Sequence, residues 1–255
     1  MKLITEKTLI IFGAFTLIAL VTFFMVYQLI TTQKNEKELS QKQVVQEAKA
    51  HFQSMVDARS WNAQYGGVYV KPVNGIKPNP YLKNNTLETK GGETLVKINP
   101  AWMTRQISQI ANKQGDYHYK ITSLKPLNPS NKADYFESQA LKYFAINTDQ
   151  KYFYQFTQDD ESFDFMGALV TKRGCLKCHA HQGYKVGDIR GGIRVSIPLE
   201  HHKQRMNFLQ EKTEYSVMIV LALAVIISII FSLLINLLFQ HQERLNQLNE
   251  VKNDD

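Results

Sequence analysis

The most conspicuous pattern along the chain is a pair of long apolar runs near its two ends. Residues 8–32 form 25 consecutive positions without a charge, and residues 215–242 form 28 more. A helix needs about 20 apolar residues to cross the hydrocarbon layer of a bilayer. A core helix of a small domain would show a polar face, which neither run has. We therefore expect transmembrane helices at residues 8–32 and 215–240, with short tails at residues 1–7 and 241–255.

The first run has a second interpretation, a cleavable signal peptide. The apolar core of a signal peptide is usually about 7–15 residues long and is followed by small residues at the cleavage site. The core here is longer, and residues 25–29 (MVYQL) offer no such site. The pattern therefore favours an uncleaved anchor. The tails carry few basic residues, so the positive-inside rule gives only a slight preference for a cytoplasmic amino terminus.

The segment between the two runs, residues 33–214, is long enough for one domain. It opens with a helical stretch in which Val45, Ala48, Phe52 and Met55 recur at spacings of three and four. Such a stripe packs against a partner helix or against the domain itself. A loop interrupted by prolines follows, and a second helix is expected to end near residue 112; the prolines are Pro72, Pro78 and Pro80.

The second half of this segment has the residue pattern that is typical of β-strands. Aromatic and β-branched residues predict strands at 117–124, 151–157, 163–171 and 192–198. A short helix is expected between the first two of these strands, near residues 135–144. Strands in series with helices on the flanks indicate an α+β fold, with a small antiparallel sheet between the two transmembrane helices.

Both cysteines of the chain lie in one motif, Cys175-Leu176-Lys177-Cys178-His179. The spacing C-x-x-C-H is that of c-type haem attachment, in which two thiols reach two vinyl groups and the histidine coordinates the iron. We predict one covalently attached haem c, with Cys175 and Cys178 as the attachment residues and His179 as the proximal iron ligand. In bacteria this attachment takes place outside the cytoplasm. The domain is therefore expected in the periplasm, and both tails in the cytoplasm.

Three other interpretations of the motif remain. A thioredoxin-like redox pair would need a β/α layout around the cysteines. A zinc site would need four ligands, and Cys175, Cys178, His179 and His181 supply the right atoms at positions too close together to converge easily. A structural disulfide is possible outside the cytoplasm, but it gives His179 no role.

Several short sequence blocks, which follow one another in a fixed order along the chain, resemble those of a known protein family. They are RSWNA at 59–63 with GGVYV at 66–70, NPYL at 79–82, NPAWMTRQ at 99–106, ITSL at 121–124 with NP at 128–129, and CLKCH at 175–179 with QGY at 182–184, GD at 187–188 and RGGI at 190–193. Together they resemble the c-type-haem, PAS-like periplasmic sensor domains that commonly stand before histidine kinases and diguanylate cyclases. The resemblance covers roughly residues 35–200. It implies a PAS-like antiparallel sheet with flanking helices, one haem on Cys175, Cys178 and His179, and a sensory role.

The resemblance leaves the sixth iron ligand open. Met103 and His118 are the candidates we favour, and a methionine ligand would raise the reduction potential relative to a second histidine. Met103 is equally explained as a helix core residue, and His118 as a strand residue facing solvent. Arg59, Arg105 and Arg190 lie within the blocks and are candidates for binding the haem propionates. The alternative for each arginine is a solvated or backbone-bonded side chain.

The function expected from these features is a membrane-anchored periplasmic sensor. The chain is expected to sense redox state or a small gas such as NO, CO or O2 through a change in haem coordination, and to signal across the inner membrane. No nucleophile motif, glycine-rich phosphate loop or carboxylate pair is present, so we do not expect an enzyme. The tail at residues 241–255 is too short for a kinase or cyclase. The output is therefore expected from a cytoplasmic partner protein or from a part absent from this chain, and a homodimer is expected by analogy.

Two rival functions remain open at the level of sequence. A membrane-anchored c-type cytochrome would only pass electrons to a redox partner. A sensor without haem would bind a small organic ligand in the same domain.

The charge distribution separates these functions from nucleic-acid binding. The formal net charge is +7, and 26 of the 30 basic residues lie between the two apolar runs. A basic segment outside the cytoplasm argues against a nucleic-acid partner. Two cysteines, 7 prolines and 13 glycines also exclude a disulfide scaffold and a low-complexity chain.

Overall fold

The computed structural model describes residues 2–73, 75–157 and 161–253, with side chains left undescribed at 2–5, 177–178 and 250–253. The chain divides into two compact units, Met1–Ser40 with Lys203–Asp255, and Gln41–His202. Two long helices, α1 (Lys2–Gln64) and α5 (Glu200–Asn253), contribute residues to both units. Each unit is described by itself below.

The first unit contains the two apolar runs. One window in α1 and one in α5 are long and apolar enough to cross a membrane, with mean hydropathies of 2.7 and 3.2 and none of either window buried. Hydroxyl groups in these runs bond to the carbonyl four residues earlier, as Thr22 does to Ile18 at 2.7 Å and Ser228 to Ala224 at 2.7 Å. Such bonds satisfy polar side chains within an apolar helix. Two such helices are compatible with a two-pass membrane protein.

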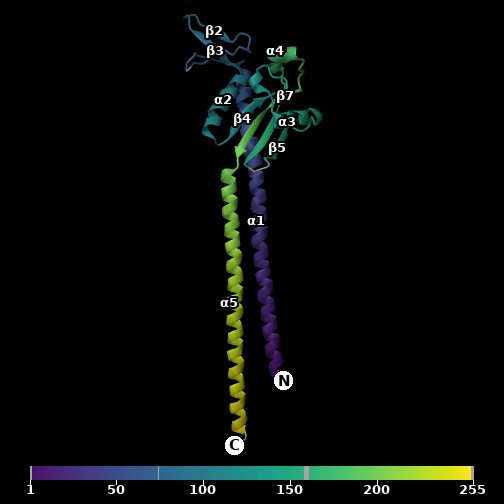
Figure 1. The fold of residues 1–255 in the computed structure, drawn as a ribbon, viewed down its shortest axis with the longest axis vertical. Helices are drawn as coiled ribbons and strands as arrows, with labels where there is room; N and C mark the ends of the chain where they lie inside the picture. Colours follow the sequence, from purple (N-terminus) through teal and green to yellow (C-terminus); the bar gives the residue numbers. More distant parts are fainter. Residues whose placement is uncertain (1, 74, 158–160, 254–255) are drawn as a thin grey trace. The chain divides into compact units, whose positions relative to one another are not determined.

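The second unit is built on a four-stranded antiparallel sheet (Figure 1). Its strands are β4 (His118–Thr122), β5 (Tyr152–Phe156), β6 (Ser162–Val170) and β7 (Ile189–Pro198), in the order β4-β7-β6-β5. The strand ends differ from those predicted by three residues or fewer. The mixed helix and antiparallel sheet confirms the α+β class.

Helices cover both faces of this sheet. On one face α1 packs through Val44, Ala48, Phe52 and Met55 against strand residues that include Phe165. On the other face α3 (Tyr135–Ile146) packs through Phe136, Ala140, Leu141 and Phe144 against Met166 and Ala168. The two faces follow from alternation along β6, because successive side chains of a strand point to opposite sides. The apolar stripe predicted on the first helix therefore packs on the sheet, except that Val44 is its fully buried first member and the predicted Val45 is only partly buried.

Two helices of this unit begin at recognisable caps. In α2 (Pro100–Gln114) the side chain of Asn99 accepts the Trp102 N–H at 2.9 Å, and Pro100 occupies the first turn. In α3 the Asp134 side chain accepts the Glu137 N–H at 3.0 Å, while the Glu137 carboxylate accepts the Asp134 N–H at 3.0 Å. A short 3-10 turn, η1 (Pro129–Asn131), precedes α3.

A second, smaller sheet was not predicted. It consists of β1 (Val68–Val70), β2 (Thr86–Glu88) and β3 (Thr94–Ile98), in the order β1-β3-β2. The expected proline loop lies between β1 and β2. The Asn62 side chain donates to the Ile98 carbonyl at 3.1 Å and so ties this sheet to α1. Two of its three strands, β1 and β2, have only three residues each, which is too short for their periodicity to be read from sequence.

Candidate functional site

The cysteine motif lies in the segment that connects β6 to β7. This segment forms three short consecutive helical turns, η2 (Arg173–Cys175), α4 (Leu176–His179) and η3 (Ala180–Gln182). Residues four apart share one side of a helical turn. Cys175 and His179 are therefore placed on the same side by the local backbone.

The two cysteines are described to different extents. Cys175 is half-buried, and its sulfur accepts a hydrogen bond from the Lys172 N–H at 3.4 Å. The side chain of Cys178 lies outside the described residues, and its backbone belongs to α4. The base of the segment is closed by the Thr171 N–H, which donates to the Asp188 carbonyl at 2.8 Å.

Both ring nitrogens of His179 have partners. Nδ1 lies 2.6 Å from Oε1 of Gln182, and Nε2 lies 2.5 Å from Nη1 of Arg190. Burial lowers the pKa of His179 from its usual value and the charge of Arg190 lowers it further, while the hydrogen bond with Gln182 acts in the opposite direction. The imidazole is thus held from both sides and favoured in its neutral form.

Arg190 reaches His179 because of an irregularity in the sheet. The pairing of β6 with β7 shifts between Leu169, which faces Gly191, and Val170, which faces Ile189. Arg190 is left as the extra residue of a bulge on β7, and bulges redirect side chains next to functional sites. The Ser123 hydroxyl donates to the Arg190 carbonyl at 2.8 Å and fixes the backbone there.

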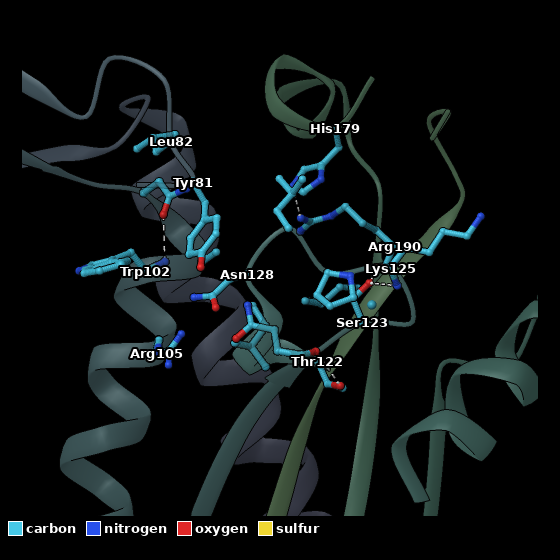
Figure 2. Close-up of a pocket in the computed structure, with 18 of the residues that line it drawn as sticks. Tyr81, Leu82, Trp102, Arg105, Thr122, Ser123, Lys125, Asn128, His179 and Arg190 are labelled. Atoms are coloured by element: carbon cyan, nitrogen blue, oxygen red, sulfur yellow. Dashed lines mark hydrogen bonds between the residues drawn. The ribbon is translucent and has the colours of Figure 1, made fainter. Parts of the chain in front are cut away.

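His179 and Arg190 form one wall of a cavity of about 100 Å³. Figure 2 shows these two side chains on one side of the cavity and Tyr81 and Trp102 on the other. Three further segments contribute lining residues: the loop before β2, the start of α2 and the end of β4 with the loop after it. This volume lies below the range of about 300–1,000 Å³ that small-molecule and cofactor sites occupy, so the cavity would have to open to admit a ligand of that size.

The described residues that line the cavity carry positive charge. Arg105, Lys125 and Arg190 are among them, and no described lining residue is an aspartate or glutamate. Apolar contact comes from residues such as Leu82, Ile121 and Leu169. The cavity therefore suits a ligand with an apolar body and negatively charged groups.

Arg59 does not line this cavity. It is buried, and its guanidinium donates to the Pro100 carbonyl at 3.0 Å and to the Thr104 hydroxyl at 2.7 Å. Its pKa is lowered to about 9, mainly by burial and also by the charge of Arg190, while Cys175 acts in the opposite direction. Of the three arginines singled out from sequence, Arg105 and Arg190 are brought to the cavity and Arg59 joins α1 to α2.

The two residues suggested as sixth ligands are also absent from the described lining of the cavity. Met103 is half-buried on α2. Its near neighbours in the sequence, Trp102 and Arg105, line the cavity, but Met103 is not among the described lining residues. His118 is exposed at the start of β4, about 13 Å along the strand from Thr122, which lines the cavity. Neither position is brought to His179, and iron ligation by either stays a prediction.

Sequence reasoning did not single out Gln182, Lys125 or Tyr81 as site residues. Gln182 and Tyr81 lie within blocks that carry the family resemblance, which was the available signal. Lys125 carries no local signal, because only the fold brings the end of β4 beside the cysteine motif.

The domain that holds this site is similar to a known protein family. The model of the Tll0287-like family matches residues 35–198. A solved structure described as the crystal structure of the cyanobacterial heme-protein Tll0287 covers 61% of this chain and 95% of its own, at 16% identity and a TM-score of 0.42. A search of curated proteins finds no match. The family match spans more than half of the chain and includes the cysteine motif, so the chain belongs to the Tll0287-like family and the resemblance identified from its sequence is confirmed.

Proposed function

We propose that this chain is a membrane-anchored c-type haem sensor, which responds to redox state or a small gas and signals across the inner membrane. The observation that carries the proposal is the position of His179. The histidine of the C-x-x-C-H motif lies in the wall of a cationic cavity, together with Arg105 and Arg190. The matched structure is described as a heme-protein.

The residues at this site fit a covalently attached haem. Cys175 and Cys178 would each add their S–H across one vinyl group, forming a thioether and placing the proton on the neighbouring carbon. His179 would coordinate iron through Nε2, which requires Arg190 to turn away from that nitrogen. Arg190 would then join Arg105 and Lys125 as a cation for the propionates. The haem supplies a one-electron redox couple and an iron that binds small gases.

Strand β7 supports a signalling role. It begins at the site, where Arg190 contacts His179, and ends at Pro198, two residues before α5 begins. Helix α5 also carries one of the two apolar windows. A change in the contacts of Arg190 would therefore act on a strand that leads directly into a candidate transmembrane helix. Such coupling needs a differential free energy of about 1–3 kcal/mol between two states.

The proposed location follows from the attachment chemistry. Covalent haem attachment outside the cytoplasm places residues 33–214 in the periplasm, and two spans then leave both tails in the cytoplasm. The proposed partners are a second copy of the chain and a cytoplasmic output protein. Neither an enzymatic activity nor a nucleic-acid partner is proposed.

Absorption spectroscopy of the purified full-length protein tests the haem assignment. The protein is produced in a host with c-type cytochrome maturation, and spectra are recorded oxidised and reduced, with and without CO and NO. We expect covalent haem that survives a denaturing gel, and a spectrum that changes with gas or with oxidation state. A protein free of covalent haem would contradict the proposal. Replacing both cysteines, Cys175→Ala with Cys178→Ala, should abolish the haem stain.

Hydrogen–deuterium exchange separates the sensor from a rival electron carrier. The sensor predicts that exchange in β7 and in the first turn of α5 differs between the oxidised and reduced protein, or between the gas-free and gas-bound protein. Identical exchange in all states, with a reduced spectrum that does not respond to CO, would favour a membrane-anchored cytochrome.

A further inference from the structure

Gln182 makes two contacts that link the cysteine motif to a distant loop. Its Oε1 lies 2.6 Å from Nδ1 of His179, and its Nε2 donates to the Lys125 carbonyl at 3.1 Å. Lys125 follows β4 and lines the same cavity as His179. A single amide side chain therefore bridges the imidazole of the motif and the backbone of the loop that follows β4.

The direction of these hydrogen bonds follows from the chemistry of their donors. An arginine guanidinium can only donate, so the bond from Arg190 Nη1 requires Nε2 of His179 to accept. A neutral imidazole that accepts at Nε2 carries its proton on Nδ1. Nδ1–H must then donate to Gln182 Oε1, which leaves the Gln182 amide N–H groups to donate elsewhere. The bond to the Lys125 carbonyl uses one of them. All three hydrogen bonds are satisfied by one arrangement, a neutral His179 with its proton on Nδ1.

The local backbone holds Gln182 in this position. Residues three apart eclipse in a 3-10 turn, and η3 brings Gln182 beneath His179 in this way. Gly183 ends the turn in the left-handed region at φ 85°, where a residue with a side chain would be strained. The bridge therefore depends on a tight turn directly after the C-x-x-C-H motif.

We propose that Gln182 is a positioning residue that holds the His179 imidazole with Nδ1 protonated and Nε2 directed at the iron, and couples it to the loop at Lys125. The inference rests on the proposed haem function. A hydrogen bond to the distal ring nitrogen orients a histidine ligand and makes it a stronger donor to its metal. Stronger donation stabilises oxidised iron, so Gln182 lowers the reduction potential of the site.

Two substitutions in the full-length, haem-loaded protein test this role. Gln182→Leu keeps the approximate size but removes the acceptor, and should raise the reduction potential and lower the iron–histidine stretching frequency in resonance Raman spectra. Gln182→Glu offers a carboxylate acceptor and should move both quantities in the opposite direction. The matched control is Gln155→Leu, at an exposed position of β5, which should leave both unchanged.

The outcomes distinguish this role from the haem assignment. A haem-loaded Gln182→Leu protein with the potential and stretching frequency of the wild type would overturn the role of Gln182 and leave the haem in place. If Gln182→Leu does not fold, Gln182→Glu decides alone: a potential at or above that of the wild type would overturn the proposal. A wild-type protein without covalent haem would instead contradict the proposed function.

Discussion

The buried carboxylate of Glu137 shows how single residues stabilise the sheet on the side away from α1. Glu137 is fully buried, and its Oε2 accepts from Lys120 Nζ at 2.8 Å and from the Asp134 N–H at 3.0 Å. Arg194 lies nearby and donates to both oxygens of Asp164, at 3.1 and 2.7 Å. Burying charges is costly unless each has a close partner. These side chains therefore stabilise the fold only as a connected set.

Removing Glu137 is predicted to be more costly than removing a surface carboxylate. Glu137→Ala leaves Lys120 without its closest partner and removes one half of the capping box, which should destabilise the protein by about 1–3 kcal/mol. Thermal unfolding of the full chain in detergent measures the effect. The control is Glu93→Ala, which breaks an exposed pair with Lys71 and should cost less than about 1 kcal/mol. Equal shifts for both variants would show that the Glu137 network is not stabilising.

At the scale of elements, α1 packs so closely against the sheet that one position of β6 has room only for glycine. A Cβ on Gly167 of β6 would collide with the ring of Phe52 on α1. That ring also contacts Phe165, with ring centroids 5.9 Å apart. Close approach of a helix to a sheet at a glycine fixes their separation, because the backbone replaces a side chain there. The helix that makes this contact, α1, also carries one of the two apolar windows.

Gly167→Ala is predicted to push Phe52 away and to destabilise the domain by about 1–3 kcal/mol. Adding Phe52→Leu should recover part of this loss, because the smaller side chain leaves room for the new methyl group. A double-mutant cycle on unfolding free energies measures the coupling. Gly91→Ala, where the nearest atom to a new Cβ is 3.9 Å away, serves as the control. Purely additive effects of the two substitutions would show that they do not share this contact.

At the scale of the whole molecule, two apolar windows flank one domain in the sequence. A pair of spans places both tails on the same side of a membrane and the intervening domain on the other. The tails are nearly neutral, so the haem chemistry of the domain, rather than tail charge, decides the proposed orientation. The orientation is therefore a consequence of the proposed function and can be tested separately from it.

Protease treatment of spheroplasts is expected to digest the domain and to spare the carboxyl-terminal tail. A small epitope after residue 255 reports on the tail, and an antibody against residues 41–202 reports on the domain. Lysed cells, in which protease reaches both sides, provide the control. Protection of the domain in intact spheroplasts would place it in the cytoplasm and contradict the orientation.

The sequence by itself determined the features that depend on near neighbours. The apolar runs, the strand segments of the main sheet and the spacing of Cys175, Cys178 and His179 are local patterns, which follow from backbone periodicity and from the reach of two thiols. The tertiary structure decided which distant residues meet that motif. A bulge directs Arg190 to His179, Gln182 reaches the loop at Lys125, and the end of β4 completes the cavity. These contacts depend on strand register and loop closure, which no local pattern specifies.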